Sequence, residues 1–249
     1  SKRIRPSTDD KFILSWNALM NIALSKAAVA LQEKPYLDQA AAHLDWMLTA
    51  FKNTGGWKHA FKNGTAYIDG NLDDYAYLIN ALLQYASSSG EPEYVKQAVS
   101  LTEETIPQFL HEENGFFYFT GKARTDIPVR KIEVYDGATP AANAVMAGNL
   151  VVLAGLAERL DWMEQAEKML QGMQATTVRY ARSFSYWACL AQKKQQGFKQ
   201  LIISGATASS LLTQWQSFYY PEVVSLCQTS DRITLPVMEK KFSENKNLL

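Results

Sequence analysis

The sequence predicts a mainly α-helical protein made of helical hairpins, with a small α/β segment at its C-terminal end. The first supporting observation is a helical motif that recurs about every 60 residues, as in arrays of helical repeats. The motif reads YLDQAAAHL from Tyr36, YVKQAVSLT from Tyr94 and WMEQAEKML from Trp162, and each copy follows a more apolar helix. The second is a change to strand-like segments after Gly197.

The first two helices differ in how their apolar residues are distributed. Residues 12–31 carry apolar or small side chains around most of the helix circumference, which is typical of a helix buried on more than one side. Residues 36–51 form a single apolar stripe and place charged residues such as Asp38 and Asp45 on the opposite face. We therefore expect each hairpin to consist of an inner helix followed by an outer helix.

The same order predicts the helices that follow. Inner helices are expected at 72–86, 140–160 and 180–193, and outer helices at 92–110 and 161–173. After each of the first two hairpins comes a glycine–aromatic segment, Gly55-Gly56-Trp57 and Asn114-Gly115-Phe116-Phe117. These segments predict short β-ribbons or turns between the hairpins.

The C-terminal part of the chain has a different pattern. Strands are expected at 200–204 and 222–228, with a helix at 208–218 between them. A strand–helix–strand of this length favours a right-handed crossover between parallel strands. We therefore divide the chain into a partial helical array at 1–196 and a small α/β segment at 197–249.

Composition argues against several classes of function. Lys plus Arg and Asp plus Glu each number 25, and the cations form no stripe that would favour nucleic acid or an anionic membrane. No apolar run reaches the roughly 20 residues of a membrane span. Cys189 and Cys227 lie far apart, which favours a reduced, cytoplasmic protein. Metal-ligand spacings and glycine-rich phosphate loops are absent from the sequence, so we expect no metal and no cofactor.

Acidic residues gather where the inner helices are expected to begin. If the inner helices run parallel around an axis, these ends converge on a shared pit. The repeat register places Asp10 and Asp136 at equivalent positions, with Asp73 and Asp74 deeper and level with Ser15. Aspartates in a first helical turn usually act as caps. Neighbouring side chains on a helix diverge by about 100°, however, so Asp73 and Asp74 must differ in direction and one must point toward packing or the pit.

Amides, aromatic residues and one histidine complete the candidate set. An amide in an apolar helix needs a hydrogen-bond partner from the protein or from a substrate, and the aromatic candidates are also explained by a place in the core. Unlike His43 and His111 on outer helices, His59 is expected in a ribbon at the same end as the pit. The candidate catalytic residues are Asp10, His59, Asp73, Asp74 and Asp136. The candidate substrate-binding residues are Trp16, Asn17, Trp57, Tyr75 and Asn143.

Three stretches occur in order along the chain: DDKFILSWNALM from Asp9, LDDYAYLI from Leu72, and DGATP from Asp136, the last followed by Asn143. They resemble signature segments of the YyaL-type, thioredoxin-domain-containing proteins, a family that includes spermatogenesis-associated relatives. The resemblance implies a thioredoxin-like domain followed by an (α/α) toroid related to six-hairpin glycosidases and N-acylglucosamine 2-epimerases. It thus implies a toroid of the six-hairpin glycosidase type for this chain.

The sequence departs from that family pattern in two ways. The sequence contains no Cys-x-x-Cys and no thioredoxin-like segment, so redox activity is not carried over. The expected helices make three and a half hairpins, fewer than a closed six-hairpin toroid, so the chain is expected to be an incomplete, C-terminal portion. An open arc would expose apolar flanks of its first and last inner helices, and we expect self-association or a complementing N-terminal half.

Three functions fit these expectations. The first is a sugar-active hydrolase in which Asp74 and either Asp10 or Asp136 lie roughly 6.5–9.5 Å apart as acid and base, as inversion requires. The second is an epimerase or isomerase, in which a base such as His59 removes a proton next to a carbonyl and an acid returns it. The third is a non-catalytic module that binds a ligand or partner. The first two imply a carbohydrate-like small molecule as ligand.

Overall fold

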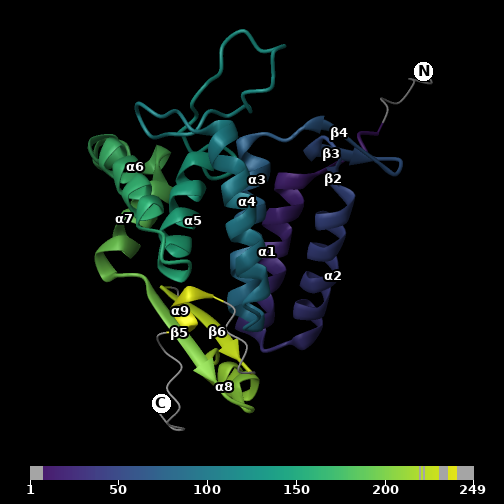
Figure 1. The fold of residues 1–249 in the computed structure, drawn as a ribbon, viewed down its shortest axis with the longest axis vertical. Coiled ribbons are helices and arrows are strands. Elements are labelled where there is room, and N and C mark those ends of the chain that lie inside the picture. The colour runs from purple at the N-terminus through teal and green to yellow at the C-terminus, as the bar shows by residue number, and fades with distance from the viewer. Residues whose placement is uncertain (1–7, 219, 221, 230–234, 240–249) are drawn as a thin grey trace, which may run out of the picture.

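The computed structural model describes residues 8–218, 220, 222–229 and 235–239. Within these residues, seven helices form the expected series of hairpins (Figure 1). They are α1 (Leu14–Leu31), α2 (Lys34–Ala50), α3 (Leu72–Ser89), α4 (Glu93–Phe109), α5 (Ala142–Leu156), α6 (Leu160–Arg179) and α7 (Ser185–Gln196). A 3₁₀ turn at Ala181–Ser183 precedes α7, which therefore begins later than expected.

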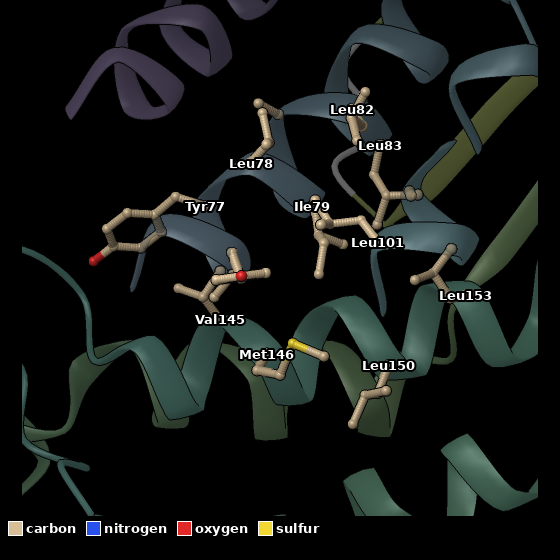
Figure 2. Close-up of a cluster of buried hydrophobic side chains, with 14 of the residues drawn as sticks. Tyr77, Leu78, Ile79, Leu82, Leu83, Leu101, Val145, Met146, Leu150 and Leu153 are labelled. Atoms are coloured by element: carbon tan, nitrogen blue, oxygen red, sulfur yellow. The ribbon is translucent and has the colours of Figure 1, made fainter. Parts of the chain in front are cut away.

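The alternation of inner and outer helices is confirmed. Helix α3 packs between α1 and α5, while α2, α4 and α6 each pack on the helix before them. No described residue of α3 or α5 is exposed, whereas α2, α4 and α6 each bury one face. Figure 2 shows the resulting core, where side chains of α3, α4 and α5 meet. The labelled residues are Tyr77, Leu78, Ile79, Leu82, Leu83, Leu101, Val145, Met146, Leu150 and Leu153.

A small antiparallel sheet lies at one end of the helices. Its strands are β1 (Phe12–Ile13), β2 (Lys52–Asn53), β3 (Gly56–Lys62) and β4 (Thr65–Asp69), and β3 pairs with the other three. The first expected ribbon is therefore confirmed. Between α4 and α5, the described residues form only isolated antiparallel bridges, Leu110 with Phe117 and Thr120 with Asn71.

Helix α1 begins at Leu14 rather than at Phe12, because Phe12 and Ile13 pair with Phe61 and Ala60 of β3. Ile13, the residue before the helix, is extended and offers no side-chain cap. The Ser15 amide in the first turn, which has no acceptor within the helix, instead donates to a side chain of another hairpin, as described below. Strand pairing and a long-range cap, neither of which periodicity encodes, therefore set the start of this helix.

The C-terminal unit lies at the end of the helices opposite to the β-ribbon (Figure 1). It contains β5 (Lys199–Ser204), α8 (Ala208–Trp215), β6 (Val223–Gln228) and α9 (Pro236–Glu239). Strands β5 and β6 are parallel, as predicted. The unit is attached to the end of α3, since the Cys227 amide donates to the Gly90 carbonyl at 2.7 Å. Residues 240–249 of the predicted segment lie outside the described residues.

The two ends of the helical series differ in their exposed surfaces. On α1, Trp16 is 68% and Met20 is 58% exposed, which confirms the expected apolar flank of the first inner helix. The same expectation is wrong for α7, because its Trp187 and Leu190 are buried and its exposed positions are mainly polar. Over the described residues, no helix has both the length and the hydropathy needed to cross a membrane.

Candidate functional site

Three side-chain contacts place the N-terminal ends of the inner helices at one end of the array. Asp74 of α3 accepts a hydrogen bond from the Ser15 amide of α1 at 3.0 Å. The Tyr77 hydroxyl of α3 donates to the carbonyl of Pro140, just before α5. Asp136, which precedes α5, accepts from the Tyr186 amide of α7 at 2.8 Å. The predicted register, with Asp74 level with Ser15, is therefore confirmed.

Asp74 is the central group of this end and is completely buried. One carboxylate oxygen, Oδ1, accepts from the Ser15 amide, and the other, Oδ2, accepts from the Asn71 amide at 2.9 Å. The second contact belongs to a capping box at the start of α3, in which Asn71 in turn caps the Asp74 amide. Both oxygens of Asp74 therefore accept backbone N–H donors where α1 and α3 begin.

His59 reaches the same carboxylate from strand β3. Its Nδ1 lies 2.8 Å from Asp74 Oδ2. An ionised carboxylate can only accept a hydrogen bond, so Nδ1 carries the proton and Nε2 is left free in the neutral ring. The hydrogen bond to Asp74 raises the pKa of His59 above 6.5, against the opposing effect of burial. The side chain remains 24% exposed, so its free nitrogen can meet a ligand.

Asp73 has a different environment from its neighbour. Burial and the adjacent Asp74 charge raise the pKa of Asp73 to about 6. Its Oδ1 and the Ser15 hydroxyl are both buried without a hydrogen-bond partner. The nearby Ser15 side chain lowers the pKa of Asp73 in part, against the larger effects of burial and Asp74. Asp73 is thus a carboxyl group that can gain or lose a proton near neutral pH.

We call His59, Asp73 and Asp74 the acid–base cluster. One nitrogen or oxygen atom from each of the three lies within 4.8 Å of the others. This is the set of described residues that could hold a metal ion, but both Asp74 oxygens already accept N–H donors. The groups left free to act are His59 Nε2 and Asp73, one imidazole and one carboxyl group. Such a pair is suited to donating and accepting protons.

The other two candidate acids lie apart from this cluster. Asp10 is exposed and forms an ion pair with Lys62, whose hydrogen bond lowers the pKa of Asp10. The expectation that Asp10 shares a poorly solvated pit with Asp74 is therefore wrong, because pairing of β1 with β3 brings Asp10 beside a lysine. Asp136 is half-buried and bonded to the Ala141 and Tyr186 amides, each at 2.8 Å. It joins the starts of α5 and α7.

The two candidate amides have partners within the protein. Asn17 donates to the Ile13 carbonyl at 2.7 Å, and its Oδ1 lies 3.1 Å from His43 Nε2 of α2. Asn143 is buried, exchanges hydrogen bonds with the backbone of Phe117 and donates to the Glu133 carbonyl. Both therefore have a structural explanation, and neither needs a substrate to satisfy it.

Two of the three aromatic candidates are buried, and the third is exposed. Tyr75 is buried against Phe109, with ring centroids 5.0 Å apart, and burial raises its pKa to about 12. Trp57 is buried and donates from Nε1 to Glu104 of α4 at 3.2 Å. Trp16 instead projects into solvent from the first turn of α1, next to Ser15. Of the three, Trp16 alone presents an open aromatic face.

Two shallow hollows stand out on the surface, and neither includes the acid–base cluster. One, of about 520 Å³, lies at the turn between α1 and α2 and is lined in part by Leu31 and Tyr36. The other, of about 280 Å³, is lined in part by Val99 and Arg159. The predicted pit therefore stays a prediction. The sequence analysis did not include Ser15 among the candidate residues. Its position level with Asp74 in the repeat could have indicated their contact.

The sequence is similar to curated proteins that are much longer. No protein family model matches it. It is 29% identical over 225 residues to an uncharacterised protein of Caenorhabditis elegans, covering 87% of this chain and 31% of that protein. It is 26% identical over 266 residues to spermatogenesis-associated protein 20 of Rattus norvegicus, covering 98% of this chain and 33% of that protein. The chain thus spans about a third of the length of these relatives.

Solved structures of sugar-active enzymes share the fold. A cellobiose 2-epimerase from Spirochaeta thermophila superposes with a TM-score of 0.55 and 18% identity, covering 68% of this chain and 44% of that chain. A glycoside hydrolase family 76 mannosidase from Bacteroides thetaiotaomicron gives 0.55 and 11%, covering 68% and 45%. A D-mannose isomerase gives 0.51 and 14%, covering 65% and 41%. The chain is therefore similar in sequence to spermatogenesis-associated protein 20 and shares the (α/α) toroid fold of these sugar-active enzymes.

Proposed function

We propose that this chain contributes an acid–base site to a carbohydrate-active protein, and that the reaction is proton transfer next to a sugar carbonyl, as in epimerisation or isomerisation. The observation that carries the proposal is the contact between His59 Nδ1 and Asp74 Oδ2, which directs the histidine's other nitrogen away from the carboxylate. Beside this pair lies Asp73, whose pKa is raised to about 6. General acids and bases work best with pKa values near the working pH.

Each residue of the cluster has a distinct role in this proposal. Asp74 positions His59 and does not touch the substrate. The Asp73 carboxylate removes the proton from the carbon next to the carbonyl of an open-chain sugar, and the carbonyl oxygen gains the electron pair. Protonated His59 supplies a proton to that oxygen from Nε2. Return of a proton to the same carbon from the other face, with loss of the proton from the former carbonyl oxygen, gives an epimer. Its delivery to the former carbonyl carbon, with loss of the proton from the neighbouring hydroxyl group, gives an isomer.

Inverting hydrolysis is less well supported by the same geometry. An inverting pair of carboxyl groups needs roughly 6.5–9.5 Å between them to admit water. The acid–base cluster lies within 4.8 Å. The partners predicted for Asp74 are also engaged elsewhere, Asp10 with Lys62 and Asp136 with helix amides. The fold is similar to those of an epimerase and an isomerase, which supports a reaction of this type. At 18% and 14% identity the similarity extends to the fold alone.

Solvent exchange tests the proposed chemistry. The full chain is incubated with D-mannose, D-glucose or cellobiose in D₂O, and deuterium at C2 is followed by NMR together with new sugar products. We expect deuterium incorporation in the native chain, a loss of at least about a hundredfold in His59→Gln and Asp73→Asn, as is typical for removal of an acid or base, and near-native rates in Asp10→Asn. Hydrolysis without exchange, or exchange that survives in both cluster variants, would refute the proposal.

A second candidate function is assembly with a complementing helical segment or another copy of this chain. The supporting observation is the apolar flank of α1, where Trp16 and Met20 are more than half exposed. Large apolar residues gathered on one face favour a protein partner. In this case the acid–base cluster would act within the completed array, and the exposed α1 face would be buried in it.

A further inference from the structure

We infer that the sugar bound at this site is uncharged, a neutral monosaccharide or oligosaccharide rather than a sugar phosphate or a uronic acid. This inference rests on the proposed function and specifies its substrate class. A phosphate or carboxylate on a sugar is ordinarily bound by Arg or Lys side chains or by an unoccupied helix N-terminus. The charges around the acid–base cluster therefore indicate which sugars can bind.

The lysines around the β-ribbon are already balanced by aspartates. The pairs are Lys11 with Asp9 at 2.6 Å, Lys58 with Asp69 at 2.6 Å, and Lys62 with Asp10. Lys11 is near enough to His59 to lower the histidine's pKa in part. Surface pairs of this kind contribute little stability, but each one leaves no net positive charge. These three lysines therefore offer little attraction to an anionic ligand.

The arginines that follow α4 are committed in the same way. Arg124 forms two hydrogen bonds with Asp126, both at 2.8 Å. Arg130 donates to the carbonyl oxygens of Gln108 and Thr120, and its guanidinium lies 4.0 Å from the centre of the Tyr118 ring. Neither guanidinium group is directed at the acid–base cluster by these contacts.

The cluster itself repels anions. The His59 imidazolium offsets the Asp74 carboxylate 2.8 Å away, which leaves Asp73 as the uncompensated charge. The start of α1, a place where an anion could bind, already has a carboxylate on its Ser15 amide, and the start of α7 has Asp136 on its Tyr186 amide. These helix N-termini are thus occupied by protein carboxylates. What remains for a ligand is a proton-sharing carboxyl group and an imidazole, which suit the hydroxyl groups of a sugar.

Matched sugars test the inference. The full chain is titrated at low ionic strength, where charge effects are largest, with D-mannose, D-mannose 6-phosphate, D-glucose, D-glucose 6-phosphate and D-glucuronate, using ligand-observed NMR. We expect a neutral sugar to bind at least about tenfold more tightly than its charged counterpart. Equal or tighter binding of a phosphate or uronate, lost in Asp73→Asn, would overturn the inference and leave the proposed function standing. Absence of binding by all five sugars would overturn the proposed function itself.

A variant that removes the partner of one lysine provides a second test of the inference. Asp9→Asn leaves Lys11 without its partner near His59, so the affinity for D-mannose 6-phosphate should rise at least about threefold while that for D-mannose stays unchanged. Asp38→Asn is the matched control, because it frees Lys34 at the start of α2, at the far end of α1. A phosphate affinity that rises equally in both variants, or in neither, would contradict the role assigned to local charge balance.

Discussion

His59 Nδ1 lies 2.8 Å from Asp74 Oδ2, and through this contact a strand of the β-ribbon shares one buried carboxylate with two helices. The same carboxylate accepts from the Ser15 amide of α1 and the Asn71 amide before α3. Three segments far apart in the sequence therefore meet at one charge. This arrangement makes Asp74 important for folding and for placing His59, and the two roles can be measured separately.

Loss of the Asp74 carboxylate should lower the stability of the chain. Asp74→Ala leaves three buried or half-buried N–H groups without an acceptor, so we expect the free energy of unfolding to fall by about 3–5 kcal/mol, and Asp74→Asn to cost about half of this. Urea unfolding measures both changes. Asp69→Asn is the control, because Asp69 pairs with Lys58 at a half-exposed position and should cost less than about 1 kcal/mol. Equal midpoints for Asp74→Ala and Asp69→Asn would contradict the assigned contacts.

The titration of His59 should depend on Asp74. The hydrogen bond to Asp74 raises the pKa of His59 above 6.5, whereas burial lowers the pKa of His43. NMR titration of the ring C–H signals should therefore show His59 titrating above His43 in the native chain. In Asp74→Asn the pKa of His59 should fall, because its charged partner is gone while burial remains. The pKa of His43 should stay unchanged, and a parallel shift of both would point to general unfolding instead.

Asp73 should make the chain less stable as the pH rises. Its pKa is about 6 in the folded chain against 3.8 when unfolded, so the folded state binds this proton more tightly. The stabilisation is fully present below pH 3.8 and is lost as the pH rises through about 6, a change of up to about 3 kcal/mol. Asp73→Asn should remove this dependence and be more stable than the native chain at pH 8.

A matched variant checks the sign of that effect. Pairing with Lys62 lowers the pKa of Asp10, so its contribution is present above pH 3.8 and lost only in stronger acid. Asp10→Asn should therefore leave the pH dependence between 4 and 6 unchanged. His59 also loses stabilisation as the pH rises, but only above 6.5, and Asp73→Asn should retain that part. Urea unfolding at pH 4, 6 and 8 separates the contributions of Asp73 and His59.

The exposed flank of α1 should drive association. Light scattering over a range of concentrations should show the native chain moving toward a larger species, because burial of Trp16 and Met20 removes apolar surface from water. Trp16→Glu combined with Met20→Glu should keep the chain monomeric. Leu160→Glu is the control, since Leu160 is 79% exposed at the start of α6 and should leave association unchanged. A native chain that stays monomeric at high concentration would refute the prediction.

Periodicity alone predicted most of the helical architecture, because burial of a helix face depends on side-chain spacing within one segment. The recurring motif separated α3 and α5 from α2, α4 and α6, and the level placement of Asp74 with Ser15 followed from the same register. Strand-like composition after Gly197 likewise predicted the parallel pair β5 and β6. These features are local or repeat at fixed intervals, so a single sequence contains them.

The environment of each carboxylate was decided only by tertiary structure. Asp73 and Asp74 are adjacent in the sequence, but Asp74 is turned onto amides of two helices whereas Asp73 keeps a buried oxygen without a partner. Asp10, equivalent to Asp136 by register, meets Lys62 because β1 pairs with β3. Hydrogen bonds and ion pairs depend on distances of a few ångströms between segments that are remote in sequence. Helix spacing could therefore locate the acids at one end of the array, and the long-range contacts alone determined which of them could exchange a proton.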